Sequence, residues 1–464
     1  MRTLAIIIGL IFLIVQPQTI GAQEKGVPPI TILRAEEDYS FLQDKDSTVV
    51  FLQPLKWITL SPNNSTALTL GGEYRPRVEH FTNRNYTPED ETFYSQRLSL
   101  HAALRLGGSI RLFGELYHGY VSEGTALLES DDLDLHQGFL EWKVMDTGAK
   151  KTVVRLGRQE VGFGASRLVG IREGPNMRRT FDMARVRYQS GGTFVNAFYG
   201  REVAVGPDAF DNKSQIFDDE PTTPGMWGLY VQNLFSHEER KIDLYYFGFS
   251  SNLARFNDVV GEERRHTIGA RSYGKINRFS YNTELIFQFG ELGNSTITAY
   301  NFEADWQYIL HTGKWKPTIG LRLDWSSGDS EVGDDKVQTF NPFFVNPALY
   351  SLAAVNTPAN STSLHPNFTV YPAEGISIFV DYALFYRTQA NDGLYAPPRF
   401  LSREANGLTE KHIGDVLGLQ FTYEINRNIS FDIRSSYFIA GKFIEATGES
   451  ENTFYVAPTA NFRF

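Results

Sequence analysis

The stretch Arg97–Leu116, RLSLHAALRLGGSIRLFGEL, decides the fold. From Leu98 onward, apolar residues occupy every second position and mostly polar or charged residues lie between them; the pattern resumes after the Gly107-Gly108 pair. A period of two is the pattern of a β-strand with one apolar face. Two glycines between two such runs are a hairpin signal. The stretch therefore predicts an antiparallel hairpin whose two faces differ in polarity.

The same alternation recurs along the chain, at residues 279–289, 300–308, 319–325, 376–384, 417–423 and 429–437. The stretch Thr453–Phe464, TFYVAPTANFRF, also alternates and ends on an aromatic residue. Such a strand is typical of the closing strand of an outer-membrane β-barrel, because every strand edge must be paired inside lipid. Aromatic residues recur near the ends of the predicted strands, as interfacial girdles require.

The connections between the alternating runs give an estimate of the strand number. Eight short turns alternate with nine longer links, among them residues 251–264 and 290–295, which predicts about eighteen strands, short periplasmic turns and long extracellular loops. This order requires a strand at Ser361–Tyr371, although Pro366 weakens that assignment. The predicted fold class is all-β, a single closed antiparallel transmembrane barrel.

The N-terminal residues predict export from the cytoplasm. Arg2 precedes an apolar stretch, Leu4–Val15, and Ala22 offers a small residue before a cleavage point. We expect a signal peptide at residues 1–22, a periplasmic lead-in or plug at 23–66, and the barrel at 67–464. The apolar stretch is too short for a membrane-spanning helix, which needs about 20 residues. The predicted location is the bacterial outer membrane.

Several motifs resemble the alginate export family of outer-membrane barrels. They are LRAEEDYS at 33–40, LGRQE at 156–160, RRTFD at 178–182 and DGLY at 392–395. The resemblance spans almost the whole chain after residue 22. It implies an eighteen-stranded pore that carries an anionic uronate polysaccharide outward through a lumen lined by arginines. The implied partners are outer-membrane lipid, the anionic polysaccharide and periplasmic secretion proteins. The net charge of −10 argues against nucleic acid as a partner.

Strand phase selects candidate lumen residues. If each apolar face meets lipid, eight arginines of the early strands point inward and are predicted to contact the substrate: Arg75, Arg77, Arg97, Arg105, Arg111, Arg155, Arg185 and Arg187. Guanidinium stays charged and binds carboxylates in a bidentate manner, so such a row lowers the barrier for a polyanion. The alternative is that these arginines pair with carboxylates of the wall. The later strands supply such inward carboxylates: Asp243, Glu284, Glu303, Asp305, Asp324, Asp381 and Asp432.

A second set of arginines lies at or in the third long link, residues 160–180. The set is Arg158, Arg167, Arg178 and Arg179. If this link folds inward, these side chains narrow the pore; otherwise they cap the loop or contact lipid headgroups.

Other classes of function are less well supported. Basic strands facing acidic strands also suit the constriction of a general or sugar-selective porin, which is the alternative hypothesis. The nine histidines are scattered and no G-x-S-x-G motif is present, so no catalytic residues, metal site or cofactor are predicted. The chain has no cysteine, which excludes disulfides and thiolate ligands.

Overall fold

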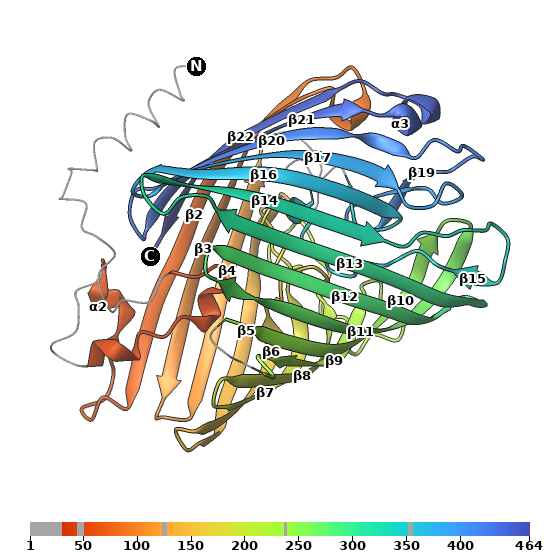
Figure 1. The fold of residues 1–464 in the computed structure, drawn as a ribbon. Coiled ribbons are helices and arrows are strands. Elements are labelled where there is room, and N and C mark those ends of the chain that lie inside the picture. Colours follow the sequence, from red (N-terminus) through yellow and green to blue (C-terminus); the bar gives the residue numbers. More distant parts are fainter. Residues whose placement is uncertain (1–29, 44–50, 123–127, 236–238, 351–355) are drawn as a thin grey trace.

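A computed structural model describes residues 30–43, 51–122, 128–235, 239–350 and 356–464. Eighteen long strands form one closed antiparallel sheet, drawn in Figure 1. The strands are β2 (Thr66–Thr82), β3 (Glu91–Leu106), β4 (Ile110–Val121), β5 (Asp131–Asp146), β6 (Lys150–Gln159), β7 (Phe181–Ser190), β8 (Thr193–Glu202), β9 (Gly225–Gln232), β10 (Lys241–Phe256), β11 (Val259–Ile276), β12 (Phe279–Leu292), β13 (Ser295–Ile309), β14 (Trp315–Ser326), β16 (Ser361–Ala373), β17 (Ile376–Arg387), β20 (His412–Glu424), β21 (Ile429–Ala440) and β22 (Thr453–Arg463). The predicted all-β barrel is confirmed.

The barrel closes between β2 and β22. Glu73 lies opposite Arg463, and Phe81 lies opposite Tyr455 in this antiparallel pair. The doubtful strand is present as β16, which pairs with β14 on one side and β17 on the other. Pro366 lies opposite Leu321, within the ladder. The count of connections therefore outweighed the local effect of a proline.

Short elements decorate the barrel. They are the 3₁₀ helices η1 (Arg34–Glu36), η2 (Ser40–Gln43), η3 (Arg84–Tyr86) and η4 (Pro347–Leu349), the α-helices α2 (Gln53–Lys56) and α3 (Lys442–Thr447), and the strands β1 (Ile58–Thr59), β15 (Lys336–Val337), β18 (Leu394–Ala396) and β19 (Phe400–Arg403). None of the described helices is long and apolar enough to cross a membrane. The predicted signal peptide lies outside the described residues.

Two outward connections are shorter than the alternation predicted. The links expected at 251–264 and 290–295 are mostly strand, and the turns contain only residues 257–258 and 293–294. Asn257 has a φ of 52° and Gly293 one of 56°, as tight hairpin turns require. The ends of these strands carry many polar residues, which obscure the alternation in the sequence. The segments nevertheless pair as strands.

The two faces of the wall differ in exposure. In β3, Leu98 and Leu100 are 42% and 53% exposed, whereas Arg97, which precedes Leu98, and Ser99, which lies between the two leucines, are buried. The exposed apolar residues form the lipid face. The buried polar side chains face a barrel interior that is occupied by other parts of the chain.

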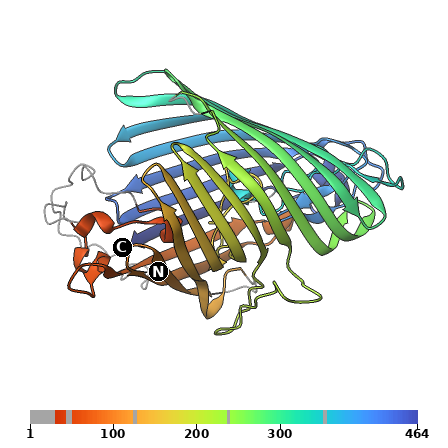
Figure 2. The same cartoon turned by 90° about the horizontal axis from the view of Figure 1, so that it is seen from below.

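Three parts of the chain lie against the inner wall. The inward loop, residues 160–180, pairs with the segment of residues 327–350 through an isolated bridge between Val169 and Phe344. The N-terminal segment, residues 30–43, lies at the barrel end where strand β22 ends, and its helices are drawn in red and orange in Figures 1 and 2. This is the end with short turns and hence the periplasmic end.

Candidate functional site

The strand phase places all eight predicted lumen arginines on the inner side of the wall. Arg75, Arg97 and Arg155 are at most 5% exposed, although each stands next to an exposed lipid-facing residue. Their guanidinium groups contact the inward loop or the N-terminal segment, or other groups inside the barrel. The alternation of the sequence therefore gave the correct side for these residues.

One group of charges, which we call the outward cluster, joins the wall to the inward loop. It consists of Glu73, Arg75 and Arg97 of the wall and Glu173 and Arg178 of the loop. Arg97 forms ion pairs of 2.7 Å with Glu73 of β2 and with Glu173 of the loop. Arg178 of the loop pairs with Glu73 at 3.3 Å and also with Glu173. Arg75 donates hydrogen bonds to the carbonyl oxygen of Glu173 and to the loop backbone. These arginines hold the loop on the wall, and their charges are compensated.

The charge of Glu173 in the outward cluster is strongly stabilised. Burial alone would raise the pKa of this loop carboxyl, but Arg178 and Arg97 hold the pKa below its usual range. Glu160 behaves differently. Burial raises the pKa of Glu160 to about 7, and its carboxyl lies 2.8 Å from His136 Nε2.

The remaining predicted loop arginines have separate roles. Arg167 pairs with Glu303 of the opposite wall at 2.5 Å, and Arg179 pairs with Glu202 at 3.0 Å. Arg158 lies in β6 and shares the outward phase of exposed Leu156; it pairs at 3.2 Å with Asp182. The prediction that Arg158 helps to narrow the lumen is therefore wrong, because its strand phase turns it away from the interior.

The periplasmic cluster joins the wall to the N-terminal segment. Glu36 pairs with Arg155 of β6 at 2.9 Å and with Arg187 of β7 at 3.0 Å. Nearby, Arg105 pairs with Asp38 at 3.0 Å, and Arg111 donates a 2.8 Å hydrogen bond to the carbonyl of Ala35. The described part of the N-terminal stretch therefore lies on the inner wall and contacts strands β3 to β7.

Arg185 differs from the other arginines of the row. It donates two hydrogen bonds to Asn196 Oδ1, at 2.8 and 3.1 Å, and lies 5.7 Å from the centre of the Phe163 ring. No carboxylate in the described ranges forms an ion pair with it. Its neighbour Arg187 retains 41% exposure of its side chain. The periplasmic cluster thus contains accessible cationic groups inside the barrel.

The acidic wall is compensated mainly by tyrosines and arginines. Tyr230 and Arg271 contact Asp243 at 2.9 and 3.1 Å, and Tyr245 donates a 2.6 Å hydrogen bond to Glu284. Glu303 receives Arg167 from the inward loop. Basic residues of the early strands and acidic residues of the later strands thus lie on different parts of the inner wall.

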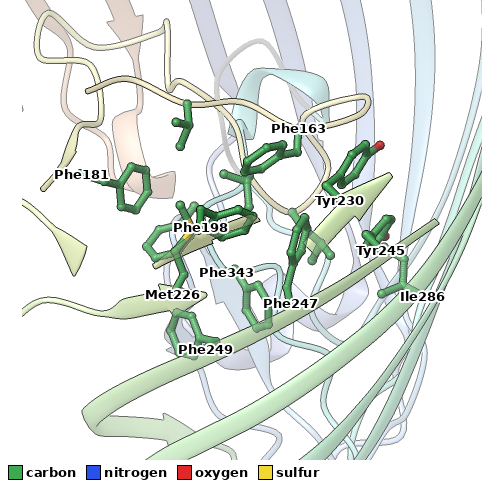
Figure 3. Close-up of a cluster of buried hydrophobic side chains, with 14 of the residues drawn as sticks. Phe163, Phe181, Phe198, Met226, Tyr230, Tyr245, Phe247, Phe249, Ile286 and Phe343 are labelled. Atoms are coloured by element: carbon green, nitrogen blue, oxygen red, sulfur yellow. The ribbon is translucent and has the colours of Figure 1, made fainter. Parts of the chain in front are cut away.

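An aromatic cluster inside the barrel anchors the inward loop (Figure 3). Phe163 of the loop stacks on Phe198 at 4.8 Å and on Tyr230 at 5.4 Å, and Phe247 lies beside them. We did not predict this cluster from the sequence. The signal was available in the run Tyr245–Phe249, YYFGF, which is apolar on both strand faces and so must be covered on the inside.

Among the described residues, no group of three histidine or carboxylate side chains is arranged to hold a metal ion. The site is thus a set of guanidinium, carboxylate and aromatic groups on the inner wall of an eighteen-stranded barrel. This architecture defines an outer-membrane pore protein of the porin type.

Comparisons with known proteins agree with this class. The family model for alginate export matches residues 66–457, and the chain belongs to the alginate export family. It is a protein of the bacterial outer membrane. No curated protein matches the sequence.

Solved structures of porins share the fold. OccK2 (OpdF) of Pseudomonas aeruginosa has a TM-score of 0.57 and 12% identity, and the alignment covers 85% of this chain and 97% of that chain. The same protein in complex with glucuronate has a TM-score of 0.56 and 11% identity, and the alignment covers 86% of this chain and 98% of that chain. OpdK of Pseudomonas aeruginosa with vanillate has a TM-score of 0.54 and 11% identity, and the alignment covers 85% of this chain and 98% of that chain.

Proposed function

We propose that this pore passes anionic saccharides of the uronate type, as oligosaccharide or polysaccharide, through its arginine-bearing lumen. The observation that carries the proposal is the periplasmic cluster. Within the described ranges, Arg185 has no ion-pair partner, and the accessible Arg187 forms an ion pair with Glu36 alone, which belongs to the N-terminal segment and not to the wall. A solute carboxylate has the chemistry to bind these guanidinium groups by charge-assisted hydrogen bonds.

Two comparisons support the choice of solute. The family is described by alginate export, and alginate is a uronate polymer. The similar structure of OccK2 contains glucuronate, and that of OpdK contains vanillate; both are carboxylates. We propose transport and not catalysis, with outer-membrane lipid, the anionic saccharide and periplasmic secretion proteins as partners.

A general or sugar-selective porin is the second candidate. The observation that favours it is the distribution of charge: the arginine row lies on early strands, where Glu73 and Glu141 offset part of its charge, and Asp243 and Glu303 lie on later strands. Basic and acidic groups on different walls produce a transverse field, which suits small neutral or zwitterionic solutes.

Single-channel conductance in planar bilayers separates the two candidates. The experiment measures the reversal potential in a salt gradient, and block by oligogalacturonate against block by neutral maltooligosaccharide. We expect anion selectivity and oligogalacturonate block. The half-blocking concentration should rise about tenfold or more in Arg185→Gln and Arg187→Gln, because each variant removes a charged hydrogen-bond donor.

Arg255→Gln is the matched control, since Arg255 is half exposed and pairs with Glu404 away from the periplasmic cluster. Equal block by the two saccharides, or equal block in wild type and both lumen variants, would reject uronate passage and favour the porin.

A further inference from the structure

The N-terminal segment is seated in the barrel by specific contacts. Arg34 is fully buried and donates hydrogen bonds to the carbonyl of Gly72 at 2.9 Å and to that of Phe464 at 2.6 Å. Glu37 binds the same guanidinium at 2.8 Å. Ala35 packs in an apolar cluster with inward-facing residues that include Ala103 and Phe113. The segment therefore has a defined position on the inner wall.

Between these anchors, the segment presents one carboxylate to the arginine row. Oε1 of Glu36 lies 2.9 Å from Nη1 of Arg155, and Oε2 lies 3.0 Å from Nη1 of Arg187. Each oxygen thus meets a different guanidinium from neighbouring strands, and Arg185 lies directly opposite Arg155 in the ladder. Guanidinium groups placed around one carboxylate in this way have the charge and the N–H donors to bind a ligand carboxylate.

The site is not fully satisfied by Glu36. The carboxylate of Glu141, on the wall, accepts hydrogen bonds from Nε and Nη2 of Arg155 at 3.0 and 2.6 Å. Nη1 of Arg155 is buried, and its ion pair with Glu36 lacks hydrogen-bond geometry, so this nitrogen has no hydrogen-bond partner. Arg155 is only 5% exposed. A carboxylate free to reorient would make a better contact at this position.

We propose that the N-terminal segment is a tethered occupant of the pore, in which the Glu36 carboxylate fills a binding site for a solute carboxylate made by Arg155, Arg185 and Arg187. The inference rests on the proposed function and makes it specific. It assigns the site to one set of residues, and it makes the seated segment a competitor that a uronate must displace. The partial exposure of Glu36 and Arg187, 28% and 41% of their side chains, leaves the contact open to exchange.

The charge of Glu36 agrees with this assignment. Burial alone would raise the pKa of Glu36, but Arg155, Arg185 and Arg187 hold the pKa well below its usual range. Glu36 therefore stays ionised at neutral pH and competes as a carboxylate. A glutamine at this position keeps the shape of the side chain and removes the charge.

The first test compares Glu36→Gln with wild type in the full chain, by oligogalacturonate block of single channels. We expect the half-blocking concentration to fall about tenfold, because the competitor loses its charge-assisted bonds. Asp146→Asn is the matched control, since it makes the same charge change in an exposed periplasmic turn, where Asp146 pairs with Lys143 and accepts a hydrogen bond from the Gly148 N–H, away from the arginine row. Unchanged or weaker block in Glu36→Gln would overturn the proposal.

The second test locks the segment in place. The chain has no cysteine, so Ala35→Cys with Ala103→Cys creates one cysteine pair, both members of which belong to the apolar cluster that joins the segment to the wall. Oxidation should abolish oligogalacturonate block and reduce conductance, and reduction should restore both; the two single-cysteine variants should not respond. Failure to crosslink, or equal block in the oxidised and reduced channel, would overturn the tethered occupant.

The two proposals fail differently. If wild type, Glu36→Gln and the reduced pair all lack oligogalacturonate block, the proposed function is wrong and the inference falls with it. If all three are blocked equally and the oxidised pair is blocked as well, uronate binding stands and the role of Glu36 is wrong.

Discussion

The outward and periplasmic halves of the barrel interior both contain inward arginines, but the surroundings of these arginines differ. In the outward half, Arg97 and Arg178 are almost fully buried and share Glu73 and Glu173. In the periplasmic half, Arg187 is 41% exposed and its carboxylate partner comes from the N-terminal segment. Two properties therefore decide whether an inward arginine is structural or available to a solute. They are the part of the chain that supplies its carboxylate partner and the exposure of the ion pair to water.

The largest effect should come from Arg178→Ala. This change leaves Glu73, Glu160 and Glu173 buried without their shared cation. Removing one partner of a buried ion pair typically costs about 3 to 5 kcal/mol. Urea unfolding of the reconstituted barrel measures the loss; a change below about 1 kcal/mol would show that the outward half does not depend on this cluster.

The next largest loss of stability should come from a change in the aromatic cluster that anchors the inward loop. Phe163→Ala removes a ring that stacks on Phe198 and Tyr230. We expect a loss of about 3 kcal/mol, since truncation of a buried phenylalanine leaves a cavity, together with a higher single-channel conductance as the inward loop loosens. Phe217→Ala is the control, because Phe217 is 95% exposed. Equal stability of the two variants would mean that the loop is not held by the cluster.

The stability of the fold should depend on pH through Glu160, which lies in the outward half. Its pKa is about 7 when folded, against an ordinary value of 4.5, so the folded protein binds more protons than the unfolded chain between these pH values. The contribution to stability is complete below about pH 4.5 and is lost as the pH rises through 7. The loss is on the order of 1 to 3 kcal/mol. Glu160→Gln should weaken this pH dependence, which is measured by comparing urea midpoints at pH 5 and pH 8. If the midpoints of the variant and wild type change equally between these pH values, Glu160 is not the source of the pH dependence.

The smallest effect on stability should come from Arg187→Ala. Its pair with Glu36 is accessible to water, and such pairs contribute at most about 1 kcal/mol. The urea midpoint should stay close to that of wild type while uronate block weakens. A loss as large as that expected for Arg178→Ala would remove the distinction between the two halves.

The sequence predicted the wall better than the contents of the barrel. Alternation is a local property, so it identified the strands and the inward phase of residues such as Arg97 and Arg187. It also required the strand at Ser361 despite Pro366. The filling of the lumen depends on which distant segments fold back inside, and no period of a single strand reports that.

Two residues show where sequence reasoning stopped. Arg158 was grouped with the third long link because it lies at the start of that link, yet β6 continues through Gln159 and turns Arg158 away from the interior. Glu36 carried no signal of its own within LRAEEDYS, because its role depends on Arg155 and Arg187, which lie more than a hundred residues away. The ion pairs of the lumen could therefore be recognised only in three dimensions.

The hydrogen bonds of Arg34 also bear on the order of assembly. Its guanidinium contacts the carbonyl of Gly72, in β2, and that of Phe464, just beyond β22; these residues lie 38 and 430 positions away along the chain. The two acceptors come together only when β2 and β22 have paired. The complete seat of Arg34 therefore exists only in the closed sheet, and a barrel stalled before closure would lack one of its two carbonyl acceptors.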